Sequence, residues 1–597
     1  MYLHKQKKKD GDLYLSIKEK YHVPKVGSRE RTVESLGYLS KLKTEYDDPI
    51  AYFDAYAKKL TAQKKVEKMK TLTIDMAEIL EIDECDARNL GYGILKRIYR
   101  ELELDKFWSW KTRNRKMQFS TDQIFRLLTF SRALQPGSKR FTLNNKNFFF
   151  ESFDDVSLDD IYHALDVISE NQQALQTWIF EHSQKLLKRD LSVSYFDCTN
   201  YYFDIGAPDL DGCDENGNPT EIKYRKRGPE KNHRPDPIVQ MGLLIDKNGI
   251  PVAYDLFPGN ESEKVHMRPL IKRVKADIND CRIIFVADRG LNTSDNIYWL
   301  NGDNKGENNP RDGYVYGQSV RGASEEFQAW LLDSRGYVTE TIADSNGDAI
   351  TFRHKSRIFP KELHVNVTKP GQKKPVKKTV SIDQKQMVYY SEKYARKQRR
   401  EREIMVARAK DLIAHPKKYD KITSKGSASY ILNIAFDKTT GEIVEGKDLQ
   451  IDEAKIAEEA KFDGYYSIVT SELEMSDIKM HETYRGLSRI EDSFKVTKTY
   501  FNSRPVYVRQ NSHIEGHFAT CFMALVLVRI LESMLGEKIP TGKLLASLKK
   551  YNCTMMEPAL WKITYYDKVL EECGKIFDWK FNQKYRTQQE LRRFLKY

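Results

Sequence analysis

Residues 194–204 read SYFDCTNYYFD, a short β-rich run that leads into one acidic residue and reaches a second seven positions later. Aromatic residues are enriched in strands, so the run before Asp197 predicts a strand that ends at this residue. Asp197 is then either a turn residue or part of a metal site. One carboxylate cannot distinguish these alternatives, because a metal site needs several oxygen ligands that converge.

The residues that follow predict a sheet. The stretch DPIVQMGLLIDKNGIPVAYDLFPGN (236–260) contains two apolar runs around Asn248-Gly249, a pair typical of hairpin turns. Residues 264–279 have helical spacing, and CRIIFVADRGL (281–291) is an apolar strand that runs into Asp288. The order strand, strand, strand, helix, strand predicts a mixed α/β sheet, with Asp197 on its first strand and Asp288 directly after its fourth.

A third candidate acid lies far along the chain, in HETYRGLSRIEDSFKVTKTYF (481–501). The apolar residues recur with helical spacing, although Gly486 interrupts the pattern. At 3.6 residues per turn, Glu491 falls on one face with Tyr484, Leu487, Phe494, Lys495 and Lys498. An acid within a largely apolar stripe is costly to bury unless it is paired, so we expect Glu491 to have partners.

Two acids at strand ends and one on a later helix are candidates to hold a divalent cation together. Hard cations such as Mg²⁺ take oxygen ligands, which carboxylates supply. Two such ions about 4 Å apart can activate the attacking oxygen and stabilise the leaving oxygen in phosphoryl transfer. Each acid also has an ordinary interpretation: Asp197 and Asp288 as turn residues, and Glu491 as an ion-pair partner on its helix.

Together these residues resemble the DDE transposases of bacterial insertion sequences, whose catalytic domain is RNase H-like. The matching acids are Asp197, Asp288 and Glu491. The segment YRGLSRIEDSFKVTK (484–498) is similar to the family's Tyr-Arg-Glu-Lys signature, in which two, three and six residues separate the four. Tyr484, Glu491 and Lys498 have this spacing, whereas Leu487 occupies the Arg position. On a continuous helix Arg485 and Arg489 lie about 120° and 160° from Glu491, so neither is an easy substitute.

The resemblance implies a cut-and-paste transposase. Asp197, Asp288 and Glu491 would be both catalytic residues and ligands of Mg²⁺ or Mn²⁺, with two ions bound. Tyr484 and Lys498 would contact the DNA backbone, and Arg289 would neutralise a phosphate or pair with an acid. The implied partners are double-stranded DNA, as element ends and target, and a second copy of the chain in a homodimer. The implied location is the bacterial cytoplasm, in association with the nucleoid.

We predict five regions. Residues 1–75 form a basic N-terminal region expected to bind DNA, 76–190 a helical domain, 191–322 with 463–535 an RNase H-like mixed sheet flanked by helices, 323–462 a β-rich insertion, and 536–597 a C-terminal helical region. A separate domain is the alternative for the insertion. Within it, EKYARKQRREREIMVARAKDLI (392–413) predicts a very basic helix, whose charges are either solvated or in contact with DNA.

Composition narrows the class of protein. Lys plus Arg number 99 against 86 Asp plus Glu in 597 residues, a net charge of +13 that favours a polyanionic partner such as nucleic acid over the alternative of a merely basic enzyme. The 7 cysteines form no CxxC pair, which argues against a zinc knuckle or a disulfide framework. The longest apolar run, FATCFMALVLV (518–528), is too short to span a bilayer, so we expect a buried helix and no membrane.

Several alternatives stay open. The chain could be a repurposed DNA-binding protein without catalysis, or an RNase H-like metal-dependent nuclease that cuts without joining. Asp204 and Asp295 are predicted to be solvated, capping or turn acids rather than ligands. HIEGH (513–517) places His513 and His517 four residues apart, but the Glu is misplaced for HExxH, and packing histidines are the preferred interpretation.

Overall fold

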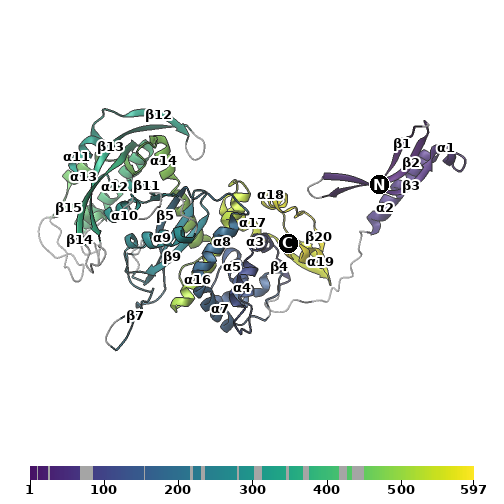
Figure 1. Ribbon diagram of the computed structural model, residues 1–597, viewed down its shortest axis with the longest axis horizontal. Helices are drawn as coiled ribbons and strands as arrows, with labels where there is room; N and C mark the ends of the chain where they lie inside the picture. Colours follow the sequence, from purple (N-terminus) through teal and green to yellow (C-terminus); the bar gives the residue numbers. More distant parts are fainter. Residues whose placement is uncertain are drawn as a thin grey trace. The chain divides into compact units, whose positions relative to one another are not determined.

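The computed structural model divides into two compact units, Met1–Leu90 with Lys550–Lys596, and Gly91–Lys549 (Figure 1). It describes residues 1–9, 11–23, 27–67, 79, 85–153, 155–215, 219–229, 235–277, 282–301, 312–343, 349–367, 376–415, 426–432 and 449–596. All three candidate acids belong to the second unit, so the first unit is described only briefly.

The first unit begins with a three-stranded antiparallel sheet. Its strands are β1 (Tyr2–Lys7), β2 (Leu13–Val23) and β3 (Gly27–Tyr38), followed by α1 (Leu39–Leu42) and α2 (Pro49–Glu67). Leu15 of β2 is fully buried and packs in one cluster with Phe53 of α2. The start of the chain is thus a small sheet packed against a helix.

The C-terminal part of this unit is a second small sheet with two helices. Its elements are β4 (Ala87–Asn89), β18 (Asn552–Glu557), β19 (Leu560–Ile563) and β20 (Tyr585–Thr587), with α18 (Lys568–Phe577) and α19 (Gln588–Lys596). The sequence predicts only helices for 536–597, and the structure adds three strands to them. In β18 only Cys553 is buried, and burial does not alternate along the strand, so this segment has no period-2 pattern that would indicate a strand.

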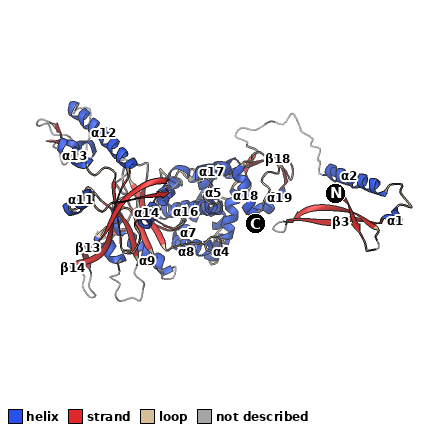
Figure 2. Cartoon of the chain, turned by 90° about the horizontal axis from the view of Figure 1, so that it is seen from above, coloured by secondary structure: helices blue, strands red, loops and turns tan. Residues whose placement is uncertain are grey.

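The helical layer of the second unit lies beside one edge of its sheet (Figure 2). It comprises α3 (Tyr92–Glu101), α4 (Leu104–Thr112), α5 (Thr121–Leu134), α6 (Lys139–Asn144), α7 (Leu158–Glu170), α8 (Gln172–Ser183), α16 (Asn511–Met534) and α17 (Thr541–Lys550). Ser120 caps α5 by accepting the Gln123 N–H, as its sequence predicts. Apart from β4, the helical character predicted for 76–190 is confirmed where the structure describes these residues.

Helix α16 contains the longest apolar run and is the centre of the helical layer. It packs against α3, α5 and α7, and against the edge strand β9. Among the described residues it is the one helix long and apolar enough to cross a membrane, but 89% of its most apolar window is buried inside the protein. That burial is the expected one for a core helix of a soluble protein.

A nine-stranded mixed sheet forms the rest of the second unit. Its order is β12-β13-β14-β17-β11-β10-β5-β8-β9. Strand β10 pairs in parallel with β5 and β11, and the other neighbours are antiparallel. The bounds are β5 (Val193–Tyr202), β8 (Ile238–Asp246), β9 (Pro251–Pro258), β10 (Ile284–Ala287), β11 (Gly313–Gln318), β12 (Val338–Ala343), β13 (Ala349–Val367), β14 (Val376–Tyr390) and β17 (Tyr465–Thr470). The predicted mixed α/β sheet is confirmed.

The strand order predicted around the two aspartates is also confirmed. In this sheet β5, β8 and β9 come first along the chain, then helix α9 (Met267–Asp277), then β10. The β8–β9 hairpin turns at Asn248-Gly249, and Gly249 has φ +82°, a conformation that favours glycine. Elsewhere, β12, β13 and β14 of the segment 323–462 continue the large sheet through β17, whereas β15 (Ile431–Leu432) and β16 (Gln450–Ile451) form a small ladder of their own.

The two faces of β5 have different roles. Phe196 and Cys198 point into the main hydrophobic core, together with Phe285 of β10 and residues of α9 and α10 (Ser294–Leu300). Because side chains alternate along a strand, Tyr195, Asp197, Thr199 and Tyr201 share the opposite face. That second face carries the candidate site.

Candidate functional site

Sheet register brings the two aspartates together. Strand β10 pairs with β5 in parallel, with Val286 opposite Tyr195. Continuing this register by two residues brings Asp288, directly after β10, level with Asp197. Adjacent strands lie about 4.8 Å apart, and residues level with each other on parallel strands point to the same face. One expectation needs correction: Asp197 lies in the middle of β5 rather than at its end, because the strand continues to Tyr202.

The segment that contains Glu491 covers this face of β5. It consists of α14 (Asp477–Arg485), α15 (Ser488–Lys495) and a π-helical turn, Val496–Tyr500. Gly486 lies against Tyr195, where a β-carbon would be 1.9 Å from the tyrosine hydroxyl oxygen. Further along, Lys498 donates to the Thr199 hydroxyl. These contacts run in the same order along both elements, so Glu491 is held over the part of β5 that carries Asp197.

The covering segment is not the continuous helix that its spacing predicts. The helix is interrupted at Gly486 and Leu487, where backbone N–H groups bond three residues back, as in Leu487 N–H to the Tyr484 carbonyl at 3.0 Å. The close approach to Tyr195 explains the interruption, since only glycine leaves room for the ring. Counting 100° per residue across the interruption therefore fails. Arg485 lines the same cavity as Glu491, contrary to the expectation that it points elsewhere.

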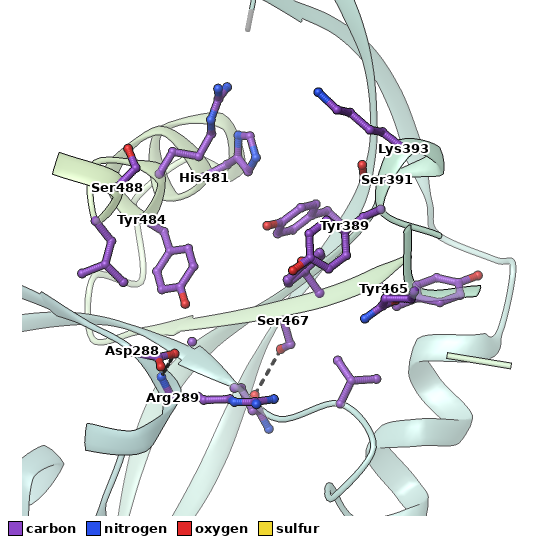
Figure 3. Close-up of a pocket in the computed structure, with 18 of the residues that line it drawn as sticks. Asp288, Arg289, Tyr389, Ser391, Lys393, Tyr465, Ser467, His481, Tyr484 and Ser488 are labelled. Atoms are coloured by element: carbon purple, nitrogen blue, oxygen red, sulfur yellow. Dashed lines mark hydrogen bonds between the residues drawn. The ribbon is translucent and has the colours of Figure 1, made fainter. Parts of the chain in front are cut away.

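Figure 3 shows a cavity with a volume of 1410 Å³, with Asp288, Arg289 and Tyr484 labelled, and all six residues predicted for the site line it. They are Asp197, Asp288, Glu491, Tyr484, Lys498 and Arg289. The other stripe residues, Leu487, Phe494 and Lys495, line it too. Residues from two strands and one distant helical segment therefore line a common cavity. In contrast, Arg489 bonds the Lys247 carbonyl outside this cavity.

The negative charges of all three acids affect the pKa of Tyr484. Burial raises its pKa well above the ordinary value, and Asp288, Glu491 and Asp197 raise it further, while Arg289 opposes them. Tyr484 is accommodated by Gly317 of β11, where a β-carbon would lie 2.5 Å from the tyrosine oxygen. The hydroxyl therefore stays protonated at neutral pH and can donate a hydrogen bond into the cavity.

The two aspartates of the cavity each accept the backbone N–H of the next residue. Asp197 accepts the N–H of Cys198 at 2.8 Å, and Asp288 accepts the N–H of Arg289 at 2.5 Å. Asp288 and Glu491 are exposed, and neither forms an ion pair with any described residue. Carboxylates that line a shared cavity are suitable oxygen donors for a hard cation such as Mg²⁺.

The three carboxylates are chemically suitable ligands for Mg²⁺, but their side chains are not arranged around one point. Within the described ranges, no group of three or more His, Cys, Asp and Glu residues has an arrangement that could hold a metal ion as it stands.

Positive charge also surrounds the cavity. Arg289, Arg321, Lys393, Arg485, Lys495 and Lys498 line it. His481 adds no charge at neutral pH, because burial, with Arg485 and His354 nearby, lowers its pKa to about 4. The sequence reasoning missed an aromatic wall formed by Tyr389, Tyr390, Tyr394, Tyr465 and Tyr466. These residues come from β14, α12 (Glu392–Ala414) and β17, and no local spacing relates them to the acids.

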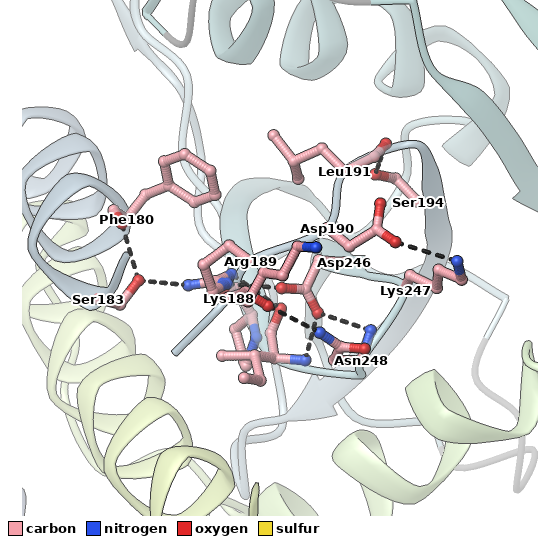
Figure 4. A network of polar contacts seen from close by, with 12 residues as sticks. Phe180, Ser183, Lys188, Arg189, Asp190, Leu191, Ser194, Asp246, Lys247 and Asn248 are labelled. Atoms are coloured by element: carbon pink, nitrogen blue, oxygen red, sulfur yellow. Dashed lines mark hydrogen bonds and ion pairs between the residues drawn. The ribbon is translucent and has the colours of Figure 1, made fainter. Parts of the chain in front are cut away.

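A buried ion pair supports the far side of α15 (Figure 4). Arg189 and Asp246 meet at 2.5 Å with side chains 1% and 0% exposed, and Asp246 also accepts the N–H groups of Asn248 and Ile250. This fixes the β8–β9 turn. Arg489 of α15 packs its side chain on Gly249 and donates to the Lys247 carbonyl at 2.8 Å, so the turn supports the helix that carries Glu491.

The residues that the sequence analysis did not assign to the site lie outside the cavity. Asp204 is exposed outside the cavity, and Asp295, in the first turn of α10, accepts the N–H of Asn366 at 3.1 Å. His513 stacks on Tyr162, and His517 is buried next to Cys521. These two histidines therefore pack, as predicted. The cysteines of the described ranges are all free.

The sequence was also compared with known proteins. No family model matches the chain, and no curated protein is significantly similar to it. The functional argument consequently rests on the site itself.

Proposed function

We propose that the chain is a metal-dependent DNA transposase of the DDE type. The observation that carries the proposal is the convergence of two strand-borne aspartates, Asp197 and Asp288, and a helix-borne glutamate, Glu491, on one cavity. We further propose that the mixed sheet is RNase H-like, with 323–462 as the insertion. A homodimer that acts on element ends and target DNA in the cytoplasm, at the nucleoid, completes the proposal.

Asp197, Asp288 and Glu491 would hold two Mg²⁺ or Mn²⁺ ions. Bound there, the metal supplies activation of an attacking oxygen and stabilisation of the leaving oxygen at phosphorus. The carboxylates of this chain provide the hard oxygen ligands, and the sheet register fixes the first two side by side.

The remaining site residues would position DNA. Tyr484 keeps its proton because of its buried, acidic surroundings, so its hydroxyl donates to a phosphate oxygen. Lys498 is oriented by its bond to Thr199, and Arg289 projects from the turn that holds Asp288. Arg485 is the candidate for the cationic role that Leu487 cannot fill. Each contact neutralises phosphate charge without reading base sequence.

The test uses a plasmid that carries the chromosomal DNA flanking the coding sequence, because the ends of a mobile element flank the gene it carries. With Mg²⁺ we expect strand cleavage at those ends and joined products. Asp197→Ala should abolish both and leave binding of the end DNA largely intact. The matched control is Asp204→Ala, which removes an exposed acid outside the cavity and should retain activity.

Each other result has a definite meaning. Cleavage without joined product would favour an RNase H-like nuclease. Binding without metal-dependent cleavage would favour a repurposed DNA-binding protein. Full cleavage and joining by Asp197→Ala would overturn the assignment of the acids.

A further inference from the structure

Helix α12 (Glu392–Ala414) is the most basic helix of the second unit and lies outside the acid cluster. Its sequence, EKYARKQRREREIMVARAKDLIA, contains eight basic and four acidic residues. A charged helix is usually a solvated one, so the arrangement of the charges decides whether α12 has a partner. Figure 2 shows α12 extending outward from the large sheet.

One face of α12 is fixed firmly to the protein. Arg402 and Asp463 form a buried pair, with Arg402 Nη1 to Asp463 Oδ1 at 2.6 Å. Gln398 accepts the Gly464 N–H at 2.7 Å, and Ala409 and Leu412 pack in a small apolar cluster. Because this face is anchored along the length of the helix, the opposite face is held in a defined position.

The opposite face carries a basic stripe. At 100° per residue its cations fall within about 60° of the direction opposite Arg402. They are Lys393, Arg396, Lys397, Arg400 and Arg408, all exposed. Arg396 and Lys397 pair with acids of their own helix. Lys393, Arg400 and Arg408 form no ion pair with any described residue, so their charges are available to a partner.

The stripe begins at the acid cavity. Lys393 and its neighbours Glu392, Tyr394 and Gln398 line the same cavity as Asp197, Asp288 and Glu491 (Figure 3). From Lys393 to Arg408 the stripe runs about 22 Å at 1.5 Å per residue. Duplex DNA carries one phosphate charge per about 1.7 Å of its axis, so a stripe of this length faces several base-pair steps.

We propose that the outward face of α12 binds the sugar-phosphate backbone of duplex DNA that leads away from the acid cavity. The choice of DNA as the polyanion rests on the proposed function, whereas the stripe and its position come from the helix itself. The cations form a fixed row that begins at the cavity proposed for phosphodiester chemistry. This row holds the duplex beyond the bond that reacts. This contact is independent of base sequence, since it reaches only phosphates.

The test compares two charge-matched double variants of the full chain. Lys393→Gln with Arg400→Gln removes two stripe cations. Arg399→Gln with Lys410→Gln removes one arginine and one lysine from the flanks of the same helix, and neither of these forms an ion pair with a described residue. Binding of a 30-base-pair duplex is measured by fluorescence anisotropy in EDTA across a salt series, so that no cleavage occurs. Circular dichroism melting verifies that both variants fold.

We expect the stripe variant to bind more weakly and its log–log salt dependence to be less steep by about 1.8, from two lost phosphate contacts at about 0.9 each. The flank variant should keep the wild-type slope. Equal slopes in all three proteins would overturn the inference, even if the wild type cleaves DNA with Mg²⁺. If only the stripe variant loses slope while no protein cleaves DNA, the inference stands and the proposed activity fails. Weaker binding of the stripe variant to phosphatidylserine vesicles, with unchanged DNA binding, would assign the stripe to a membrane instead and overturn it.

Discussion

Two aspartates of the same sheet, one at the end of each of the strands that flank β5, have environments of opposite character. Asp246, at the end of β8, is fully buried, paired with Arg189 and bonded to two backbone N–H groups. Asp288, after β10, is exposed, accepts the N–H of its own neighbour, and forms no ion pair with a described residue. The sheet stabilises one carboxylate completely and leaves the other open to the cavity.

This difference separates a structural acid from a reactive one. A buried carboxylate is tolerated only when its charge and hydrogen bonds are satisfied, so Asp246 contributes to stability and has no capacity for a ligand. Asp197, Asp288 and Glu491 share a cavity, and carboxylate oxygens are ligands that a hard cation can use. Removing a structural acid should therefore cost stability, and removing a cavity acid should cost activity.

The largest expected effect is on activity. Glu491→Gln keeps the size of the side chain but removes its charge. Because the proposed function makes Glu491 a ligand of the metal that acts on the reacting phosphate, we expect strand cleavage to fall by roughly 10⁴-fold, or ~5 kcal/mol. The melting temperature should be unchanged, since Glu491 is exposed. Asp492→Asn, at the neighbouring exposed acid of α15, is the control. Equal loss in both variants would mean that general charge, not the cavity, matters.

The converse variant is Asp246→Ala. It leaves the Arg189 guanidinium buried without its anion, and we expect the free energy of unfolding to fall by about 3–5 kcal/mol. Urea denaturation followed by tryptophan fluorescence measures the loss. Asp204→Ala, at an exposed acid, should change it by less than about 0.5 kcal/mol. A stable Asp246→Ala protein would remove the basis for calling this acid structural.

A smaller effect concerns the contact that positions α15. In Gly486→Ala the new β-carbon would lie 1.9 Å from the Tyr195 hydroxyl oxygen, so the segment must shift. We expect a loss of about 1–3 kcal/mol in stability and reduced cleavage. Gly206→Ala, where a β-carbon meets nothing within 4 Å, should behave as wild type. Unchanged cleavage by Gly486→Ala would show that α15 need not be held against β5.

The smallest effect is on pH dependence. The folded-state pKa of His481, about 4, lies below its ordinary value of 6.5, so on acidification the unfolded chain takes up the proton first. Stability should therefore fall as the pH decreases from about 6.5 towards 4, by roughly 1 kcal/mol at pH 5.5. His481→Gln should flatten this part of the pH profile of the melting temperature. His364→Gln, at an exposed histidine, should leave the wild-type profile intact.

The sequence predicted the parts of this arrangement that follow from periodicity. Strand alternation and order were sufficient for β5, the β8–β9 hairpin, β10 and the position of Asp288 directly after β10, but not for the end of β5, which continues beyond Asp197. The spacing also grouped Tyr484, Glu491 and Lys498, which line one cavity although the segment is not one continuous helix. These features depend on residues close together in the chain.

What the sequence could not predict depends on contacts between distant segments. The interruption at Gly486 arises from Tyr195, almost 300 residues earlier, and it is the reason that Arg485 reaches the cavity. The pairing of β14 with β17 likewise brings an aromatic wall to the site, and no spacing within either segment indicates it. The sequence does not indicate which distant strands lie side by side in the sheet, and only the observed strand pairing shows it.

The most direct test of the central claim is Mn²⁺ binding, measured by electron paramagnetic resonance on the DNA-free protein. We predict that the wild type binds Mn²⁺, that Asp204→Asn binds it equally well, and that the double variant Asp197→Asn with Asp288→Asn loses the binding while its melting temperature is unchanged. Mn²⁺ binding by the folded double variant that equals the wild type would contradict the claim that these carboxylates form the metal site.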